Sequence, residues 1–275
     1  MNIVHAIAHS LETLRASKPI VHHITNYVTV NDCANIALAI GASPIMADEA
    51  DEMKDIVSLA GALVLNVGTL NHRTVESMLL AGKYANERNI PVVLDPVGAG
   101  ASALRGKTVE RLLHEVKISV LRGNLSEIRF AAGLESLAAG VDASEADLAR
   151  SAAAARESAE LAGRQLGCVI GLTGAVDVVT DGSRTVLIRN GVPELSGVTG
   201  TGCMCSTLVG AFCAVEHDLL LAAAGGIMAM GIAGELAAEA SAGRGSGSFH
   251  IGIIDAASRL DSDLILRLAK LDARA

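Results

Sequence analysis

Short apolar runs alternate with longer amphipathic stretches along most of this chain. Four runs, at residues 62–68, 91–95, 118–124 and 168–174, are mostly Val, Leu and Ile and end in Gly, Asn or Asp. Apolar positions with helical spacing lie at residues 74–86, 107–116 and 144–165. Continuous apolar strands that alternate with helices are typical of a parallel sheet covered on both faces. The pattern predicts one α/β domain over residues 1–275, without internal repeats or linkers.

Three further helices are predicted around this framework. Residues 2–14 form an amphipathic pattern, and the apolar residues 30–40 are closed by Gly41. Residues 219–240 are the most apolar stretch, but glycines and glutamates interrupt it. A buried or interface helix explains that stretch better than a membrane span does.

Two features complete the expected fold. Residues 176–180 and 185–189 flank Asp181-Gly182-Ser183, which predicts a hairpin at a sheet edge. The Gly/Ser-rich residues 243–248 predict a loop within the domain.

Composition and charge narrow the partners and the compartment. Hydrophobic residues make up 51% of the chain and aromatic residues only 2%, so Ala, Val, Leu and Ile must fill the core. The net charge of -8 and the lack of a Lys/Arg run argue against nucleic acid as a partner. No secretion-like start is visible, and five cysteines without a C-x-x-C spacing suggest reduced thiols, so we expect a cytoplasmic protein that binds no membrane.

Polar residues follow the predicted strands at the points where the strands end. Asn66, Asp95, Asn124 and Thr173 all occupy such positions. Each of them alone could simply start a turn or cap a helix. In open α/β sheets ligands bind outside the carboxyl ends of the strands, so the repetition at four strand ends predicts a site there.

The segment Val-Thr-Gly-Thr-Gly-Cys-Met-Cys at residues 198–205 is the most informative stretch of the chain. A glycine turn that feeds a helix start aims free backbone N–H groups and the positive end of the helix dipole at one point. Such a point is an anion site, most often for phosphate. Cys203 lies in the first turn, where a thiol pKa is lowered most easily. A tight turn with a buried cysteine is the plainer alternative, whereas a phosphate cradle would suggest phosphoryl transfer.

The N-x-x-E spacing of Asn124 and Glu127 adds a second candidate feature. An amide and a carboxylate three residues apart share one face of a helical turn and could hold hydrated Mg²⁺ together with Asp95. A helix-capping pair is the alternative. Arg122, two residues earlier, could reach nucleotide phosphates or could be a surface arginine.

Several other motifs do not fit. Gly106-Lys107-Thr108 has Ala101 where the phosphate loop of nucleotide triphosphatases needs glycine. Neither G-x-G-x-x-G after the first strand nor G-x-S-x-G is present, which argues against a dinucleotide-binding domain and an α/β-hydrolase. His22 and His23 are adjacent and point in different directions, so they rarely chelate one ion. Met46, expected on a loop, could line a small aromatic substrate pocket or pack in the core.

Taken together, several stretches resemble the hydroxyethylthiazole kinase family of the ribokinase-like superfamily. The stretches run in order along nearly the whole chain. Each alone is a weak signal, but their combination is highly specific. They are His22-His23-Ile24-Thr25-Asn26, Gly41 to Met46, Asn66 to Leu70, Asp95 to Ala101, Arg122 to Glu127, Thr173-Gly174 followed by Asp177, and Val198 to Cys203. The resemblance implies a three-layer αβα domain with a mostly parallel sheet. It implies transfer of the ATP γ-phosphate to 4-methyl-5-(2-hydroxyethyl)thiazole, with Mg²⁺ and a homotrimer whose thiazole sites lie at subunit interfaces.

The resemblance also assigns roles to residues. It implies that Met46 and Gly200 contact the thiazole and that Asn26 faces the substrate pocket. Arg122 and Thr173, with Asn124 beside them, are implied as ATP-binding residues, and Asp95 and Glu127 lie near the metal. The implied catalytic segment is Gly200, Thr201, Gly202 and Cys203.

One departure from the wider superfamily raises a question about the chemistry. Ribokinase-like kinases usually carry an aspartate base after the glycines of the anion hole, whereas this chain, like hydroxyethylthiazole kinases, has Cys203. A thiolate beside a triphosphate meets like-charge repulsion, and phosphoryl transfer through a loose transition state needs little base help. Our hypothesis is that Cys203 orients the hydroxyl while backbone amides and Mg²⁺ carry most of the rate.

Two alternatives stay open at this point. One is a hydroxymethylpyrimidine-type kinase or an ADP-linked dehydratase of the same superfamily, against which Cys203 argues. The other is a catalytically silent thiazole or nucleotide sensor, against which the intact Asp95 and Glu127 argue.

Overall fold

The computed structural model describes residues 2–134 and 145–274, which build one nine-stranded sheet with helices on both faces. The strand order is β2-β1-β3-β4-β5-β6-β7-β8-β9. The first six strands in this order are parallel: β2 (Ser43–Met46), β1 (Ile20–Ile24), β3 (Ala62–Asn66), β4 (Val92–Asp95), β5 (Val120–Asn124) and β6 (Val169–Thr173). Their carboxyl ends therefore meet along one edge of the sheet.

Three antiparallel strands continue the sheet beyond β6. They are β7 (Asp177–Thr180), β8 (Thr185–Ile188) and β9 (Leu271–Arg274). The hairpin predicted around Asp181-Gly182-Ser183 is confirmed as β7 and β8. Its predicted place at the edge was wrong, because the C-terminal strand β9 pairs with β8 and takes the edge position.

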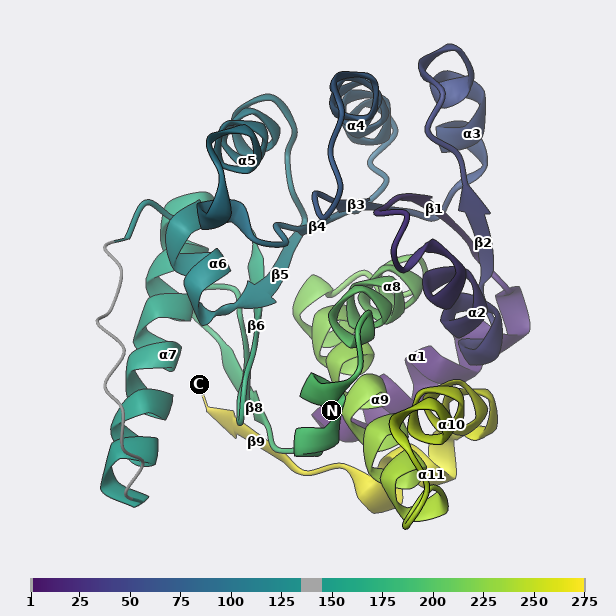
Figure 1. Ribbon diagram of the computed structural model, residues 1–275, viewed down its shortest axis with the longest axis vertical. Helices are drawn as coiled ribbons and strands as arrows, with labels where there is room; N and C mark the ends of the chain where they lie inside the picture. The colour runs from purple at the N-terminus through teal and green to yellow at the C-terminus, as the bar shows by residue number, and fades with distance from the viewer. Residues whose placement is uncertain (1, 135–144, 275) are drawn as a thin grey trace.

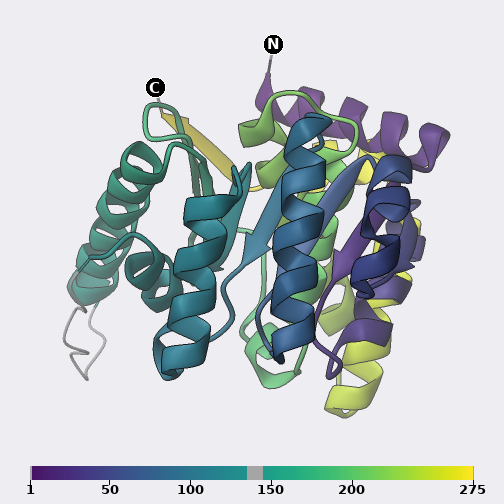
Figure 2. The same ribbon diagram turned by 90° about the horizontal axis from the view of Figure 1, so that it is seen from above.

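The alternation of side chains along the parallel strands creates two cores. In β3, Leu63 and Leu65 pack in one core and Val64 packs in the other. Figures 1 and 2 show helices on both sides of the sheet. One side carries α3 (Met53–Leu59), α4 (His72–Glu87), α5 (Ala103–Glu115), α6 (Leu125–Ala131) and α7 (Glu145–Leu166). The other carries α1 (Ile3–Ser17), α2 (Val30–Ile40), α8 (Thr201–Cys213), α9 (Leu219–Ala240), α10 (Ser246–Arg259) and α11 (Ser262–Leu268). The predicted three-layer αβα architecture is confirmed.

Close packing of α9 against α8 places the helix that carries Cys203. A Cβ atom at Gly226 of α9 would collide with the backbone of Val209 and would lie 2.8 Å from the carbonyl carbon of Leu208. Only glycine lets the two helix backbones approach this closely. The position of α8 over the sheet therefore depends on a small residue in another helix.

The helix α9 is also the one helix of the described chain that is long and apolar enough to cross a membrane. Buried residues make up 78% of its most apolar window, which places it in the protein core. The sequence interpretation of residues 219–240 as a buried helix agrees with this packing.

Two local predictions were wrong. Met46 lies at the end of the edge strand β2 and not on a loop. The Gly/Ser-rich stretch 243–248 is only partly a loop, because α10 begins at Ser246. The start of the helix predicted over 144–165 lies outside the described residues, and its remainder is confirmed as α7.

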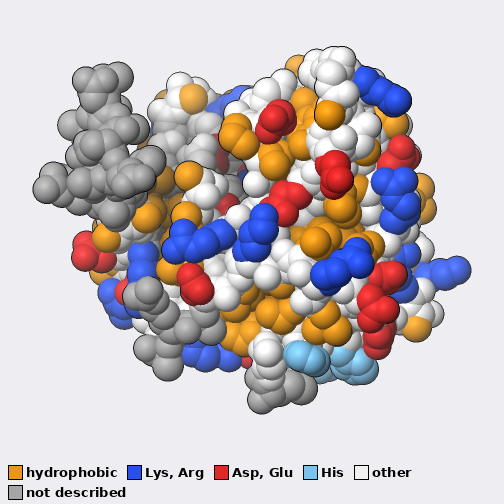
Figure 3. All heavy atoms as spheres, turned by 90° about the horizontal axis from the view of Figure 1, so that it is seen from below, with side chains coloured by type: hydrophobic (Ala, Val, Ile, Leu, Met, Phe, Trp, Pro, Cys, Tyr) orange, Lys and Arg blue, Asp and Glu red, His pale blue; other side chains and the backbone are white. Residues whose placement is uncertain are grey.

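Charges of both signs are dispersed over the face of the molecule seen from below. Figure 3 shows one face, on which basic, acidic and apolar side chains alternate without a broad field of one sign. The acidic balance of the sequence, 30 Asp and Glu against 22 Lys and Arg, is thus not gathered into one patch on this face.

Candidate active site

The polar residues at the strand ends meet the N-terminus of α8. Gly200 precedes this helix with a left-handed backbone (φ 90°), a conformation that favours glycine. No side chain caps the helix, so the N–H groups of its first turn stay available to an anion. The Thr201 hydroxyl donates to the carbonyl oxygen of Leu195 at 2.9 Å and holds the preceding loop against the turn. This geometry would suit the phosphate cradle expected from the sequence, which stays a prediction.

The Cys203 thiol is held by two asparagine amides. Asn26 Nδ2 donates to its sulfur at 3.2 Å, and Asn66 Nδ2 does so at 3.3 Å. Asn26 also donates to Asn66 Oδ1 at 3.0 Å. The loop after β1 and the end of β3 thus bring two amides to one sulfur atom. Sequence reasoning placed Asn66 at a strand end but did not select it as a site residue.

Asp95 lies directly beside this group and is only 1% exposed. Its Oδ2 atom accepts hydrogen bonds from Ser206 Oγ at 2.8 Å and from Asn66 Nδ2 at 3.0 Å. Its Oδ1 atom is buried and has no hydrogen-bond partner in the described chain. Burial raises the pKa of the Asp95 carboxyl to about 6, although the Arg122 charge works in the opposite direction. An unpaired buried carboxylate oxygen suits a hard cation such as Mg²⁺.

The environment of Cys203 does not favour a thiolate. Burial raises the pKa of the Cys203 thiol above its ordinary value, and the nearby Asp95 charge adds to the rise. The hydrogen bonds from Asn26 and Asn66 work the other way but do not outweigh burial. At neutral pH the sulfur therefore carries its proton, in contrast to cysteines at helix starts that act as nucleophiles.

Arg122 and Thr173 lie together at the end of neighbouring strands. Arg122 Nη2 donates to Thr173 Oγ1 at 2.6 Å, and Arg122 Nη1 lies 3.9 Å from Asp95 Oδ2. A Cβ atom at Gly202 would lie 2.9 Å from Arg122 Nη1, so the guanidinium group rests against the α8 turn. Its side chain is 11% exposed, so the alternative of a surface arginine is excluded.

Asn124 and Glu127 form a reciprocal capping box at the start of α6. Glu127 Oε2 accepts from the Asn124 N–H at 2.9 Å, and Glu127 Oε1 accepts from the Gly98 N–H at 2.8 Å. The capping alternative weighed for this pair is therefore correct as a description of its local structure. Both carboxylate oxygens keep a free lone pair and lie near enough to Asp95 to raise its pKa.

Arg105, which the sequence analysis did not select, ties two of the loops together. Its Nη2 atom donates to the carbonyl oxygen of Gly68 at 2.6 Å, and its Nη1 atom donates to that of Val97 at 2.7 Å. These carbonyls follow β3 and β4, so one side chain of α5 connects the loops beside Asn66 and Asp95. No sequence signal marked it, since an arginine in an amphipathic helix is usually solvated.

A cavity of about 560 Å³ opens beside the cradle. Arg122, Thr173 and Gly202 contribute polar groups to its lining. The loop after β8 and α9 contribute apolar side chains, including Val192, Pro193, Leu195, Ile227 and Met230. A lining that combines a cationic group with apolar side chains suits a ligand with a charged tail and a flat apolar head.

Met46 stands apart from these contacts. It is half-buried at the carboxyl end of β2, opposite His23 of β1, and so lies at the same edge of the sheet. No described contact connects it to Cys203 or to the cavity.

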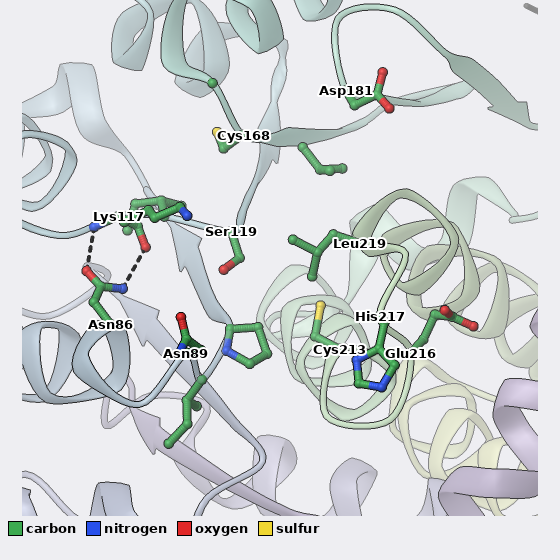
Figure 4. Close-up of a pocket in the computed structure, with 15 residues that line it drawn as sticks. Asn86, Asn89, Lys117, Ser119, Cys168, Asp181, Cys213, Glu216, His217 and Leu219 are labelled. Atoms are coloured by element: carbon green, nitrogen blue, oxygen red, sulfur yellow. Dashed lines mark hydrogen bonds between the residues drawn. The ribbon is translucent and has the colours of Figure 1, made fainter.

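A second cavity, of about 370 Å³, lies at the opposite edge of the sheet, where β4, β5 and β6 begin. Figure 4 shows that Asn86 there is paired with the backbone of Lys117, through hydrogen bonds of 2.7 and 3.0 Å. Burial raises the pKa of both cysteines in its wall, Cys168 and Cys213, to about 12. Among the described residues no group of three His, Cys, Asp or Glu side chains could hold a metal ion. The described residues that line this cavity therefore show no arrangement typical of a catalytic or metal-binding site.

Comparisons with known proteins identify the relatives of this chain. The model of the hydroxyethylthiazole kinase family matches residues 11–263. A hydroxyethylthiazole kinase of Ruminiclostridium cellulolyticum is 55% identical over 266 residues, which cover 97% of each chain.

Solved structures support the same relationship. The hydroxyethylthiazole kinase of Pyrococcus horikoshii OT3 superposes with a TM-score of 0.87 at 37% identity, over 98% of this chain and 99% of that one. A ribokinase-like superfamily protein of Enterococcus faecalis has a TM-score of 0.63 at 11% identity, over 90% and 89% of the two chains, and so shares the fold.

Proposed function

This chain belongs to the hydroxyethylthiazole kinase family, and we propose that its reaction takes place at the N-terminus of α8. It is a phosphotransferase that phosphorylates the hydroxyl of 4-methyl-5-(2-hydroxyethyl)thiazole in thiamine salvage. This location rests on the uncapped first turn of α8, which contains Cys203 and lies beside Asp95 and Arg122.

ATP binds, in this proposal, in the cavity beside the cradle. Its phosphates lie toward Arg122, Thr173 and the α8 turn, where backbone N–H groups and a guanidinium group offset negative charge. Asn124 is the register partner of Thr173 across β5 and β6 and so lies beside the phosphates in this proposal. The base lies against the apolar side chains of the lining, at the loop after β8.

Asp95 and Glu127 would hold Mg²⁺. The fit rests on the buried, unpaired Oδ1 atom of Asp95 and on the Glu127 carboxylate near it. When bound, Mg²⁺ neutralises charge on the triphosphate. The protein's own part is to hold both carboxylates in place through Ser206, Gly98 and Asn124.

The thiazole alcohol lies on the Cys203 side of the cradle, bordered by Gly200, Asn26 and, at the end of β2, Met46. Cys203 orients the hydroxyl and does not remove its proton. Because the pKa of the thiol is raised, the sulfur is already protonated at neutral pH and cannot accept another proton. Positioning and charge compensation by Thr201, Gly202 and their neighbours supply most of the rate in this proposal. We further propose a cytoplasmic homotrimer whose thiazole sites are completed at subunit interfaces.

A direct assay tests the proposed reaction. The protein is incubated with ATP, Mg²⁺ and hydroxyethylthiazole, with hydroxymethylpyrimidine as a parallel acceptor, and products are identified by mass spectrometry. We expect phosphorylated thiazole and little phosphorylated pyrimidine. Phosphorylation of the pyrimidine alone would identify a different kinase, and nucleotide binding without any product would identify a sensor.

A further inference from the structure

We propose that Glu235 is a positioning residue for the nucleotide, which it controls by anchoring the part of the cavity wall that contacts the base. The proposal rests on the proposed place of ATP in this cavity. Glu235 lies on α9, and it does not line the cavity itself. Its effect passes through Asn190 and Gly191, which do line the cavity.

One carboxylate oxygen of Glu235 holds the start of the wall. Its Oε1 atom accepts from the Gly191 N–H at 2.8 Å and from Asn190 Nδ2 at 3.2 Å. Gly191 has a left-handed backbone (φ 131°), so the chain turns sharply at the anchored residue. The Asn190 side chain is also held by the Leu268 carbonyl oxygen at 2.9 Å and by the Lys270 N–H at 2.8 Å. For the Gly191 N–H the acceptor is Glu235, so this bond fixes where the loop leaves β8.

The same face of α9 contacts the loop and lines the cavity. Ile227, Met230 and Gly231 line it, and Glu235 follows at the spacing of one helical face. A Cβ atom at Gly231 would lie 2.7 Å from the carbonyl carbon of Asn190, so loop and helix are in direct contact. Glu235 therefore sets the spacing between the loop and the helix that would enclose a base.

The second carboxylate oxygen connects this wall to the C-terminal segment. Lys270 Nζ donates to Glu235 Oε2 at 2.9 Å, but the lysine side chain is 55% exposed. The Glu235 side chain is 18% exposed, and an ion pair whose lysine is open to solvent contributes little. The bond from Gly191 to Oε1 should thus matter more than the negative charge, which distinguishes two substitutions at this position.

The test compares Glu235→Ala with Glu235→Gln and uses Glu239→Ala as the matched control. Glu239 is an exposed residue one turn further along α9. Glu235→Ala removes the oxygen that accepts from both Gly191 and Asn190, so we expect the KM for ATP to rise about five- to tenfold with kcat and the thiazole KM unchanged. Glu235→Gln keeps an acceptor for Gly191 and should stay within about twofold of wild type, as should the control.

Binding measurements separate this role from general destabilisation. By calorimetry, Glu235→Ala should weaken ATP by the same factor while leaving inorganic tripolyphosphate, which has no base, unchanged. An equal loss for both ligands, a fall in kcat without a change in the ATP KM, or no effect of Glu235→Ala would overturn the proposal. If wild-type protein binds ATP but makes no phosphorylated thiazole, the proposed function fails while the calorimetric test of Glu235 still stands.

Discussion

At the scale of single residues, Cys203 is the point where sequence and structure differ most in what they suggest about chemistry. A cysteine in the first turn of a helix is expected to ionise easily. Here burial and the nearby Asp95 charge raise the pKa of the thiol. The environment of a side chain, and not its place in a motif, decides its charge.

Replacement of Cys203 tests whether the thiol only orients the substrate. Cys203→Ala should lower kcat by about ten- to a hundredfold, which is at or below the smallest effect usual for loss of a general base, about a hundredfold. Cys203→Ser should lose less, since its hydroxyl can still accept from Asn26 and Asn66. The measurement is kcat against pH for both variants. A Cys203→Ala enzyme without activity above background would show that the thiol is an obligate base.

Asp177 provides a second prediction at this scale, through the dependence of stability on pH. Burial raises the pKa of this carboxyl to about 7, although the Gly174 N–H donates to it at 2.9 Å. Between about pH 4 and pH 7 the folded protein therefore binds more protons than the unfolded chain, so the contribution of Asp177 to stability is lost as pH rises.

Asp177→Asn should remove this loss while it keeps an acceptor for Gly174. We expect the variant to lose less stability than wild type between pH 5 and pH 8, by on the order of 2–4 kcal/mol. Urea denaturation at the two pH values measures it. Asp95 titrates in both proteins, so the difference between the two curves isolates Asp177. Equal losses in the two proteins would contradict the prediction.

At the scale of elements, the sequence predicted the strands and helices with strong patterns and missed those without them. The four apolar runs became β3, β4, β5 and β6 because they are buried on both faces. By contrast, β1 carries two histidines and β9 lies at the C-terminal edge, so neither shows the usual strand pattern. Their pairing partners, which no local pattern contains, decide their structure.

For the candidate site too, the sequence predicted the residues that belong to a strong local pattern and missed the others. Strand ends and the glycine turn could be found from the sequence because parallel strands bring their carboxyl ends together. Ser206 and Arg105 could not, since each makes its contact from the body of a helix with residues far away in the chain. Long-range contacts of this kind depend on how helices pack on the sheet.

Packing between α8 and α9 leads to a prediction about Gly226. Gly226→Ala would place a Cβ atom against the backbone of Val209 and Leu208, which cannot rotate away as a side chain can. We expect a loss of stability of about 1–3 kcal/mol and lower activity, since α8 carries the cradle. Gly247→Ala is the control, because a Cβ atom there meets no heavy atom within 4 Å. Equal stability of the two variants in urea denaturation would refute this account.

At the scale of the whole molecule, the proposed trimer depends on the surface around α2 and α10. Leu38 of α2 is 59% exposed, and Ile251 of α10 is 62% exposed. The two helices pack against each other, and Nε2 of His250 in α10 lies 3.1 Å from Oδ1 of Asp32 in α2. Asp32 in turn lies against Gly200, since a Cβ atom there would be 3.2 Å from its Oδ2 atom. A partner on this surface would therefore touch elements that border the cradle.

Charge introduced on this surface should separate the subunits. In wild type we expect a mass near three times the 28.1 kDa of one chain, by sedimentation equilibrium. The double variant Leu38→Arg, Ile251→Arg should shift it toward one chain, because desolvation of two unpaired guanidinium groups opposes association. Activity should fall with the mass, since each thiazole site would lose its neighbour. Leu161→Arg, on the exposed side of α7 across the sheet, is the control and should leave both unchanged. A wild-type monomer with full activity would show that one chain suffices, and the thiazole pocket would then have to be complete between Asn26, Cys203 and Met46 of a single subunit.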